Sequence, residues 1–147
     1  MIREITEKDR KIYLELSEEF YSSPAVSHKI DIKNCENAFE ETLKGSPYIK
    51  IFMFEADGKP VGYGQVSFTY SIEAGGLTLW LEEAYVKPEY RSRGLGSEFF
   101  EYVFYNYGKV AKRYRLEIDP DNLRAEKLYV KQGFSDMPYK PMVKENF

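Results

Sequence analysis

Residues 81–97 read LEEAYVKPEYRSRGLGS, and this stretch decides the fold. Its first part continues the apolar run that starts at Leu77 and predicts a strand that ends at Val86, before Pro88. The loop that follows combines two arginines with two glycines: Arg91, Arg93, Gly94 and Gly96. Glycines let the backbone approach a ligand closely, and the unpaired N–H groups at a helix start attract anions. The stretch therefore predicts a strand–loop–helix unit that binds phosphate, and two exposed arginines beside an ordinary helix start are the alternative.

Two common phosphate-binding loops are excluded. The chain has no GxxxxGK[ST] sequence, so it has no Walker A loop. Gly94-x-Gly96 lacks the third glycine of a GxGxxG loop, and it follows strands that we expect to be antiparallel.

The spacing Arg91-x-x-Gly94-x-Gly96 resembles the acetyl-coenzyme A loop of the GNAT superfamily of N-acetyltransferases. Residues 122–134 read NLRAEKLYVKQGF, which is similar to that superfamily's pattern N-x-x-A-x-x-L-Y-x-x-x-G-F. The opening IREIT, followed by Asp9, is similar too. The resemblance extends over essentially the whole chain and is strongest over residues 77–134.

Hydrophobic periodicity and turn residues predict the elements along the chain. We expect helices over 8–21, 32–44, 97–107 and 122–132, strands over 48–55, 61–70, 77–86 and 115–118, and one or two short strands in 134–147. This order implies a mixed sheet in an α/β or α+β domain. The resemblance makes it a single GNAT-like domain over 1–147, with a mostly antiparallel sheet, helices on both faces, and parallel strands 77–86 and 115–118 that splay apart at one end.

The resemblance also implies where acetyl-CoA binds. The pantetheine arm would pair with the backbone of Ala84, Tyr85 and Val86, and the pyrophosphate would lie on the loop of Arg91, Ser92, Arg93, Gly94, Leu95, Gly96 and Ser97. Asn122 is expected to cap its helix or to touch pantetheine, and both roles are compatible.

Acyl transfer to an amine needs a neutral amine and a proton for the departing thiolate. Ala125, Leu128 and Tyr129 share one helical face, so Tyr129 is expected to point toward the sheet and the cofactor. The resemblance implies that Tyr129 is the general acid to the coenzyme A sulfur. Packing alone is the alternative.

Glu82 and Glu83 come late in an apolar strand, and alternation places them on opposite faces. A carboxylate there would take the proton of the amine. Glu82 matches the position at which some GNAT relatives carry a base, so it is preferred. A bulge would change the alternation, so Glu83 stays an alternative and a candidate contact of the acceptor, together with Tyr21 and His28.

The composition of the chain argues against several kinds of binding site and several classes of protein. One His and one Cys in 147 residues build neither a His/Cys zinc site nor an internal disulfide, and the net charge of −3 argues against a dedicated nucleic-acid binder. The charged start MIREITEKDR has no signal-peptide core, and no apolar run approaches the ~18 residues of a membrane span. We expect a cytoplasmic monomer or homodimer without a metal, bound to neither nucleic acid nor membrane.

The combined prediction is an N-acetyltransferase that moves an acetyl group from acetyl-CoA directly to the primary amine of a small molecule. No cysteine lies in the site segments, which argues against a covalent acyl-enzyme. A protein or peptide N-acetyltransferase and a non-catalytic acyl-CoA-binding module are the alternatives.

Overall fold

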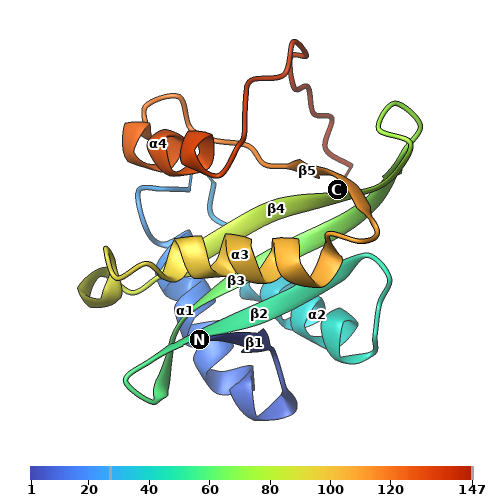
Figure 1. Cartoon of the computed structure of the whole chain (residues 1–147). Helices are drawn as coiled ribbons and strands as arrows, with labels where there is room; N and C mark the ends of the chain where they lie inside the picture. The colour runs from blue at the N-terminus through green and yellow to red at the C-terminus, as the bar shows by residue number, and fades with distance from the viewer. Residues whose placement is uncertain (27, 147) are drawn as a thin grey trace. The chain divides into compact units, whose positions relative to one another are not determined.

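The computed structural model describes residues 1–26 and 28–146. The chain divides into two compact units, Met1–Glu117 and Ile118–Phe147, and Figure 1 labels their α-helices and strands. The first unit is built on one five-stranded sheet. Its strands lie in chain order: β1 (Ile2–Glu4), β2 (Ile49–Ala56), β3 (Lys59–Ser71), β4 (Gly76–Val86) and β5 (Ala111–Arg115). The first four strands pair antiparallel and β4 pairs parallel with β5. This confirms the predicted mixed, mostly antiparallel sheet.

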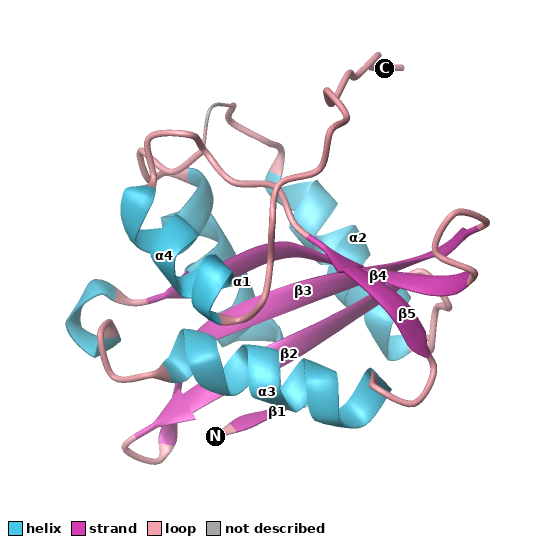
Figure 2. Cartoon of the chain, turned by 45° about the horizontal axis from the view of Figure 1, so that its top comes forward, coloured by secondary structure: helices cyan, strands magenta, loops and turns pink. Residues whose placement is uncertain are grey.

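Helices cover both faces of this sheet, as expected (Figure 2). The helices of the first unit are the short 3-10 helices η1 (Glu7–Asp9) and η2 (Pro88–Tyr90) and the α-helices α1 (Arg10–Tyr21), α2 (Ile32–Leu43) and α3 (Leu95–Tyr107). Helices α1 and α2 lie on one face, and α3 lies on the other.

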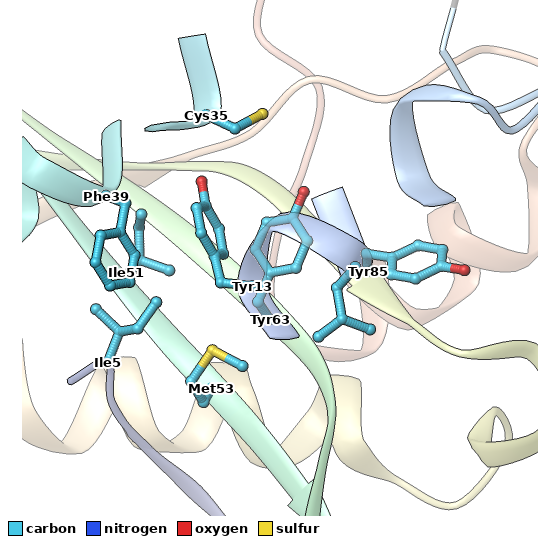
Figure 3. Packing of buried hydrophobic residues seen from close by; sticks show 9 residues of the cluster. Ile5, Tyr13, Cys35, Phe39, Ile51, Met53, Tyr63 and Tyr85 are labelled. Carbon is cyan, nitrogen blue, oxygen red and sulfur yellow. The ribbon is translucent and has the colours of Figure 1, made fainter. Parts of the chain in front are cut away.

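The side chains of β2 show how the two faces are filled. Ile51 and Met53 join the buried cluster that α1 and α2 cover, which includes Tyr13 and Phe39 (Figure 3). Phe52 and Phe54, which alternate with them, contact the ring of Phe99 in α3 at centroid distances of 5.9 and 5.0 Å. One strand therefore supplies both halves of the core.

The N-terminus is tied to α1 by a buried carboxylate. Asp9 is 4% exposed, and its two oxygens accept hydrogen bonds of 2.8 Å from Arg3 Nη1 and Nη2. The backbone N–H of Thr6 donates to the same carboxylate at 2.8 Å. This pairing fixes the turn between β1 and the first helices.

Two expectations for the strands are wrong, and one strand was missed. The strand predicted over 115–118 lies at Ala111–Arg115, because Tyr114 packs its ring on Phe104 of α3 at 4.7 Å and so sets the register of that edge. The strands expected in 134–147 are absent from residues 134–146, and β1 was not foreseen. With three residues, β1 is too short for periodicity to reveal.

The second unit holds α4 (Leu123–Lys131), close to the predicted helix 122–132. Asn122 caps it, because its side-chain oxygen accepts from the N–H of Ala125 at 3.1 Å. No helix within residues 1–26 and 28–146 is long and apolar enough to cross a membrane.

Candidate active site

Strands β4 and β5 separate after a short stretch of pairing. Their register runs from Leu77 opposite Ala111 to Trp80 opposite Arg115, whereas β4 continues to Val86. Within the part of the chain that the structure describes, no strand pairs with this edge of residues 81–86. The predicted splay is therefore present, and it leaves a stretch of strand edge open.

The open edge offers backbone groups to an extended ligand. The N–H of Lys87 donates to Val61 O of β3 at 2.9 Å, so the backbone of Lys87 and Tyr85 faces β3. Because successive residues of a strand direct their backbone groups to opposite edges, those of Ala84 and Val86 face the open edge. Of the three residues predicted to pair with pantetheine, Ala84 and Val86 are placed to do so, whereas the side chain of Tyr85 lies in the α1/α2 core.

The loop after β4 forms a cradle of backbone N–H groups. Gly94 adopts a left-handed conformation, with φ of +87°, directly before α3. The first hydrogen bond of the helix runs from the N–H of Glu98 to Gly94 O at 2.9 Å. Three N–H groups of the first turn therefore have no acceptor within the helix: those of Leu95, Gly96 and Ser97.

Gly94 itself borders open space, since a Cβ atom placed there meets no other atom within 4 Å. A phosphate group fits this arrangement, because it needs backbone N–H donors and a close approach that a side chain would block. Leu95 contributes only its backbone, since its side chain is buried in the core.

The two loop arginines have different surroundings. Arg93 makes two hydrogen bonds of 2.9 and 3.0 Å to the carboxylate of Asp57, in the β2–β3 turn, and so anchors the loop to that hairpin. Arg91 Nε donates to Val86 O at 2.9 Å, which places this guanidinium where the open edge meets the cradle.

A bulge in β4 determines which of Glu82 and Glu83 points toward the protein interior. Gln65 of β3 lies opposite Glu83, but the next residue, Val66, lies opposite Leu81. Glu82 is thus the extra residue of β4, and its side chain is exposed. Glu83 points to the face that α1 and α2 cover.

The carboxylate of Glu83 is held by two phenols. Tyr63 Oη donates to Oε1 at 2.7 Å, and Tyr21 Oη, at the end of α1, donates to Oε2. Burial raises the pKa of Glu83, the two phenol hydrogen bonds oppose that rise, and the charge of Glu82 adds to it. Burial also raises the pKa of both tyrosines, so they remain donors at neutral pH.

The titratable groups that also face Glu83 are neutral at pH 7. Tyr13 of α1 and Cys35 of α2 interact electrostatically with its carboxylate, and burial raises the pKa of each. Among the described residues, the other ionisable groups that act on this carboxylate are Tyr21, Tyr63 and Glu82. Glu83 is therefore a half-buried acid held by hydroxyl groups, with a pKa above that of an ordinary glutamate.

The remaining predicted site residues have surroundings of their own. His28 is exposed, beside Ser27, which lies outside the described residues. Asn122 and Tyr129 belong to the second unit, where the ring of Tyr129 lies 6.2 Å from that of Phe134 and burial raises the pKa of its phenol. Sequence reasoning missed Tyr63, because its place on the face of Glu83 follows from the pairing of Gln65 with Glu83, which the sequence does not reveal. Among the described residues, no group of three His, Cys, Asp or Glu side chains is arranged to hold a metal ion.

Comparison with known proteins gives consistent matches. Residues 10–134, which span both compact units, match the model of the Acetyltransferase (GNAT) family. Thialysine N-epsilon-acetyltransferase of Bos taurus is 33% identical over 151 residues, covering 93% of this chain and 85% of the bovine protein.

Solved structures share the fold. A possible acetyltransferase from Clostridium difficile 630 superimposes with a TM-score of 0.84 at 19% identity, over 100% of this chain and 97% of that one. Aminoglycoside acetyltransferase AAC(6')-Iy, in complex with the bisubstrate analog CoA-S-monomethyl-acetylneamine, gives a TM-score of 0.79 at 18% identity, over 100% and 98% of the two chains.

Proposed function

The chain belongs to the GNAT acetyltransferase family, and on that premise we propose that it transfers an acetyl group from acetyl-CoA to the primary amine of a small molecule. The transfer takes place directly, in a complex that holds both substrates. The observation that carries the proposal is that two features are adjacent on β4. The half-buried acid Glu83 is followed directly by Ala84, whose backbone groups face the open edge of the strand.

Acetyl-CoA would be held by the edge and the cradle. Ala84 and Val86 offer backbone groups to the pantetheine amides, and the N–H groups of residues 95–97 offer donors to the pyrophosphate. Arg91 adds positive charge between the two segments. When bound, acetyl-CoA supplies the thioester carbonyl that the amine attacks.

We assign the base to Glu83 rather than to Glu82. A raised pKa makes the carboxylate of Glu83 a better match for proton transfer near neutral pH than an ordinary exposed glutamate. Each oxygen already accepts one phenol hydrogen bond, and a carboxylate oxygen has a second lone pair with which to accept the proton of the ammonium group. Glu82, exposed beside it, contributes negative charge that attracts a cationic acceptor.

Tyr129 is proposed as the acid that protonates the coenzyme A thiolate. Its motif position supports this role, and its raised pKa keeps the phenol protonated at pH 7. The nitrogen loses two protons on the way from ammonium to amide. Glu83 takes the first before attack and releases it to solvent after turnover. The second leaves the nitrogen as the tetrahedral intermediate collapses, and through water it restores the phenol of Tyr129, which has given its own proton to sulfur.

The acceptor is proposed to be a small amine because relatives are named for such substrates, thialysine and an aminoglycoside. A peptide amine is the second candidate acceptor, and one assay distinguishes it from a small amine. Release of coenzyme A thiol is measured with acetyl-CoA and either small primary amines or peptides with a free N-terminus or lysine, with a control that omits the acceptor.

The proposal predicts thiol release with at least one small amine and acetylation of that amine by mass spectrometry. Thiol release with peptides alone would contradict the small-molecule assignment. Release that does not depend on any amine would contradict acetyl transfer itself.

A further inference from the structure

An arginine and a tryptophan lie against each other where β4 and β5 separate. Trp80 and Arg115 are the last pair in the register of the two strands. The guanidinium carbon of Arg115 lies 4.1 Å from the centroid of a Trp80 ring, and both side chains are half-buried. Neither residue has a role in the function proposed above.

The bulge at Glu82 places this pair on the same face of the sheet as Glu83. Glu83 lies opposite Gln65, and Trp80 lies opposite Ser67. Residues opposite each other share a face, and so do residues two apart on one strand, which links Glu83, Gln65, Ser67 and Trp80. Glu83 and Trp80 are three residues apart, so in a regular strand without the bulge they would point to opposite faces.

Contacts on the other face confirm this assignment. Phe68, the neighbour of Ser67, contacts Tyr107 of α3, and Tyr114, the neighbour of Arg115, contacts Phe104 of the same helix. Trp80 and Arg115 therefore face away from α3, toward the side that carries Glu83.

In the described part of the chain, no acid matches the charge of Arg115. Arg113, two residues earlier on the same strand and face, pairs with Glu73 at 2.9 Å. Among the described residues, no carboxylate lies within 4.0 Å of Arg115. Stacking on an indole occupies the flat face of a guanidinium and leaves its N–H edge to donate to a planar anion, with carboxylate as the matching geometry.

We propose that Arg115, positioned by Trp80, binds the carboxylate of an acceptor whose amine lies at Glu83, so that the enzyme prefers amines that also carry a carboxylate. This inference rests on the proposed function. Arg115 lies on the strand next to Trp80, and because of the bulge Glu83 lies only two residue steps along the sheet from Trp80. With strands about 4.8 Å apart and a rise of about 3.3 Å per residue, the Cα atoms of Glu83 and Arg115 are roughly 8 Å apart. A few methylene groups between amine and carboxylate span this distance.

The test compares two acceptors that differ in one charge, 6-aminohexanoate and its neutral amide, 6-aminohexanamide. The wild-type enzyme is expected to show a KM for the acid about 10- to 100-fold below that for the amide, with similar kcat, since a hydrogen-bonded charge pair has that effect on affinity. Arg115→Gln should remove this preference by raising the KM of the acid alone. Arg115→Lys, which keeps the charge but loses the planar fork, should restore only part of it.

Arg113→Gln is the matched control, because Arg113 shares the strand and the face but is paired with Glu73. It should leave both KM values unchanged. Equal use of acid and amide by the wild type would overturn the inference while leaving acetyl transfer intact. An Arg115→Gln variant that raises the KM of acetyl-CoA instead would assign the guanidinium to the cofactor and also overturn it.

If the wild type acetylates neither compound, the proposed function fails for this class of acceptor, and calorimetry with 6-aminohexanoate decides the inference by itself. Binding to the wild type but not to Arg115→Gln would support the carboxylate site. Absence of binding to the wild type would contradict it.

Discussion

The hydroxyl group of Tyr63 donates a 2.7 Å hydrogen bond to Glu83 Oε1, and this bond joins a residue of β3 to the carboxylate that follows the bulge of β4. The bond stabilises the ionised form of Glu83 against the rise in pKa that burial causes. The protonation of Glu83 therefore depends on a neighbour that need not touch either substrate.

Tyr63→Phe should move the acidic limb of the pH profile to higher pH. Removal of a donor to the charged carboxylate raises the pKa of Glu83 further, and a hydrogen bond to a charged group corresponds to about one to two pH units. The measurement is kcat/KM for the amine from pH 5 to 9, with acetyl-CoA saturating. Tyr102→Phe, a half-buried tyrosine of α3 on the other face, is the control and should leave the limb in place. A Tyr63→Phe profile equal to that of the wild type would show that Glu83 does not set the limb.

Gly94→Val should abolish measurable binding of acetyl-CoA. The new side chain enters the open space of the cradle and blocks the approach of phosphate to the backbone. It also introduces strain, because φ at Gly94 is +87°, and left-handed backbone costs other residues about 1–2 kcal/mol.

Gly75→Val separates these two effects. Gly75, in the β3–β4 turn, has φ of +81° and equally open surroundings, so it carries similar strain away from the cradle. Calorimetry should find acetyl-CoA affinity retained in Gly75→Val and lost in Gly94→Val, with both variants folded by circular dichroism. Normal binding by Gly94→Val would remove the loop from the cofactor site.

Tyr129→Phe should lower kcat by about 10²- to 10⁴-fold, the usual contribution of a general acid. The ring remains, so its contact with Phe134 is kept. Affinity for acetyl-CoA should change by less than about tenfold, since at most one hydrogen bond is lost. Kinetics at pH 7 with saturating acetyl-CoA measure the first effect, and calorimetry measures the second. Unchanged kcat would rule out the acid role, whereas lost affinity with normal kcat would make Tyr129 a binding residue.

Asp9→Asn should destabilise the fold by about 1–3 kcal/mol at pH 7, because it removes the charge from a buried carboxylate that Arg3 and Thr6 hold. The hydrogen bonds of Arg3 lower the pKa of Asp9 below its ordinary value of 3.8. Its stabilising contribution is therefore complete above about pH 4 to 5 and is lost as the pH falls through the lowered pKa. Urea unfolding at pH 7 and at pH 2.5 should show the difference between wild type and Asp9→Asn narrowing at the lower pH. A difference that is the same at both pH values would contradict this role.

Local features of the chain were predictable from sequence, whereas features set by pairing between strands were not. The glycine-containing loop before α3, the helix that follows it and the cap at Asn122 all depend on residues close in the chain. The face occupied by Glu83 depends on a bulge that forms only when β3 and β4 pair. Alternation alone therefore leaves both glutamates open, and only the resemblance to GNAT relatives favours Glu82. The register of β5 likewise depends on Tyr114 packing against α3, which local periodicity does not record.

The most direct test of the account compares Glu83→Gln with Glu82→Gln. Glutamine keeps the size of the side chain and an oxygen that accepts from one of the two phenols, Tyr21 or Tyr63, while its amide N–H donates to the other, but it does not take a proton. The measurement is kcat/KM for the accepted amine at pH 7 with saturating acetyl-CoA. Glu83→Gln is expected to lose about 10²- to 10⁴-fold and Glu82→Gln to change only slightly, with acetyl-CoA affinity unchanged in both. Wild-type activity in Glu83→Gln, or the larger loss in Glu82→Gln, would contradict it.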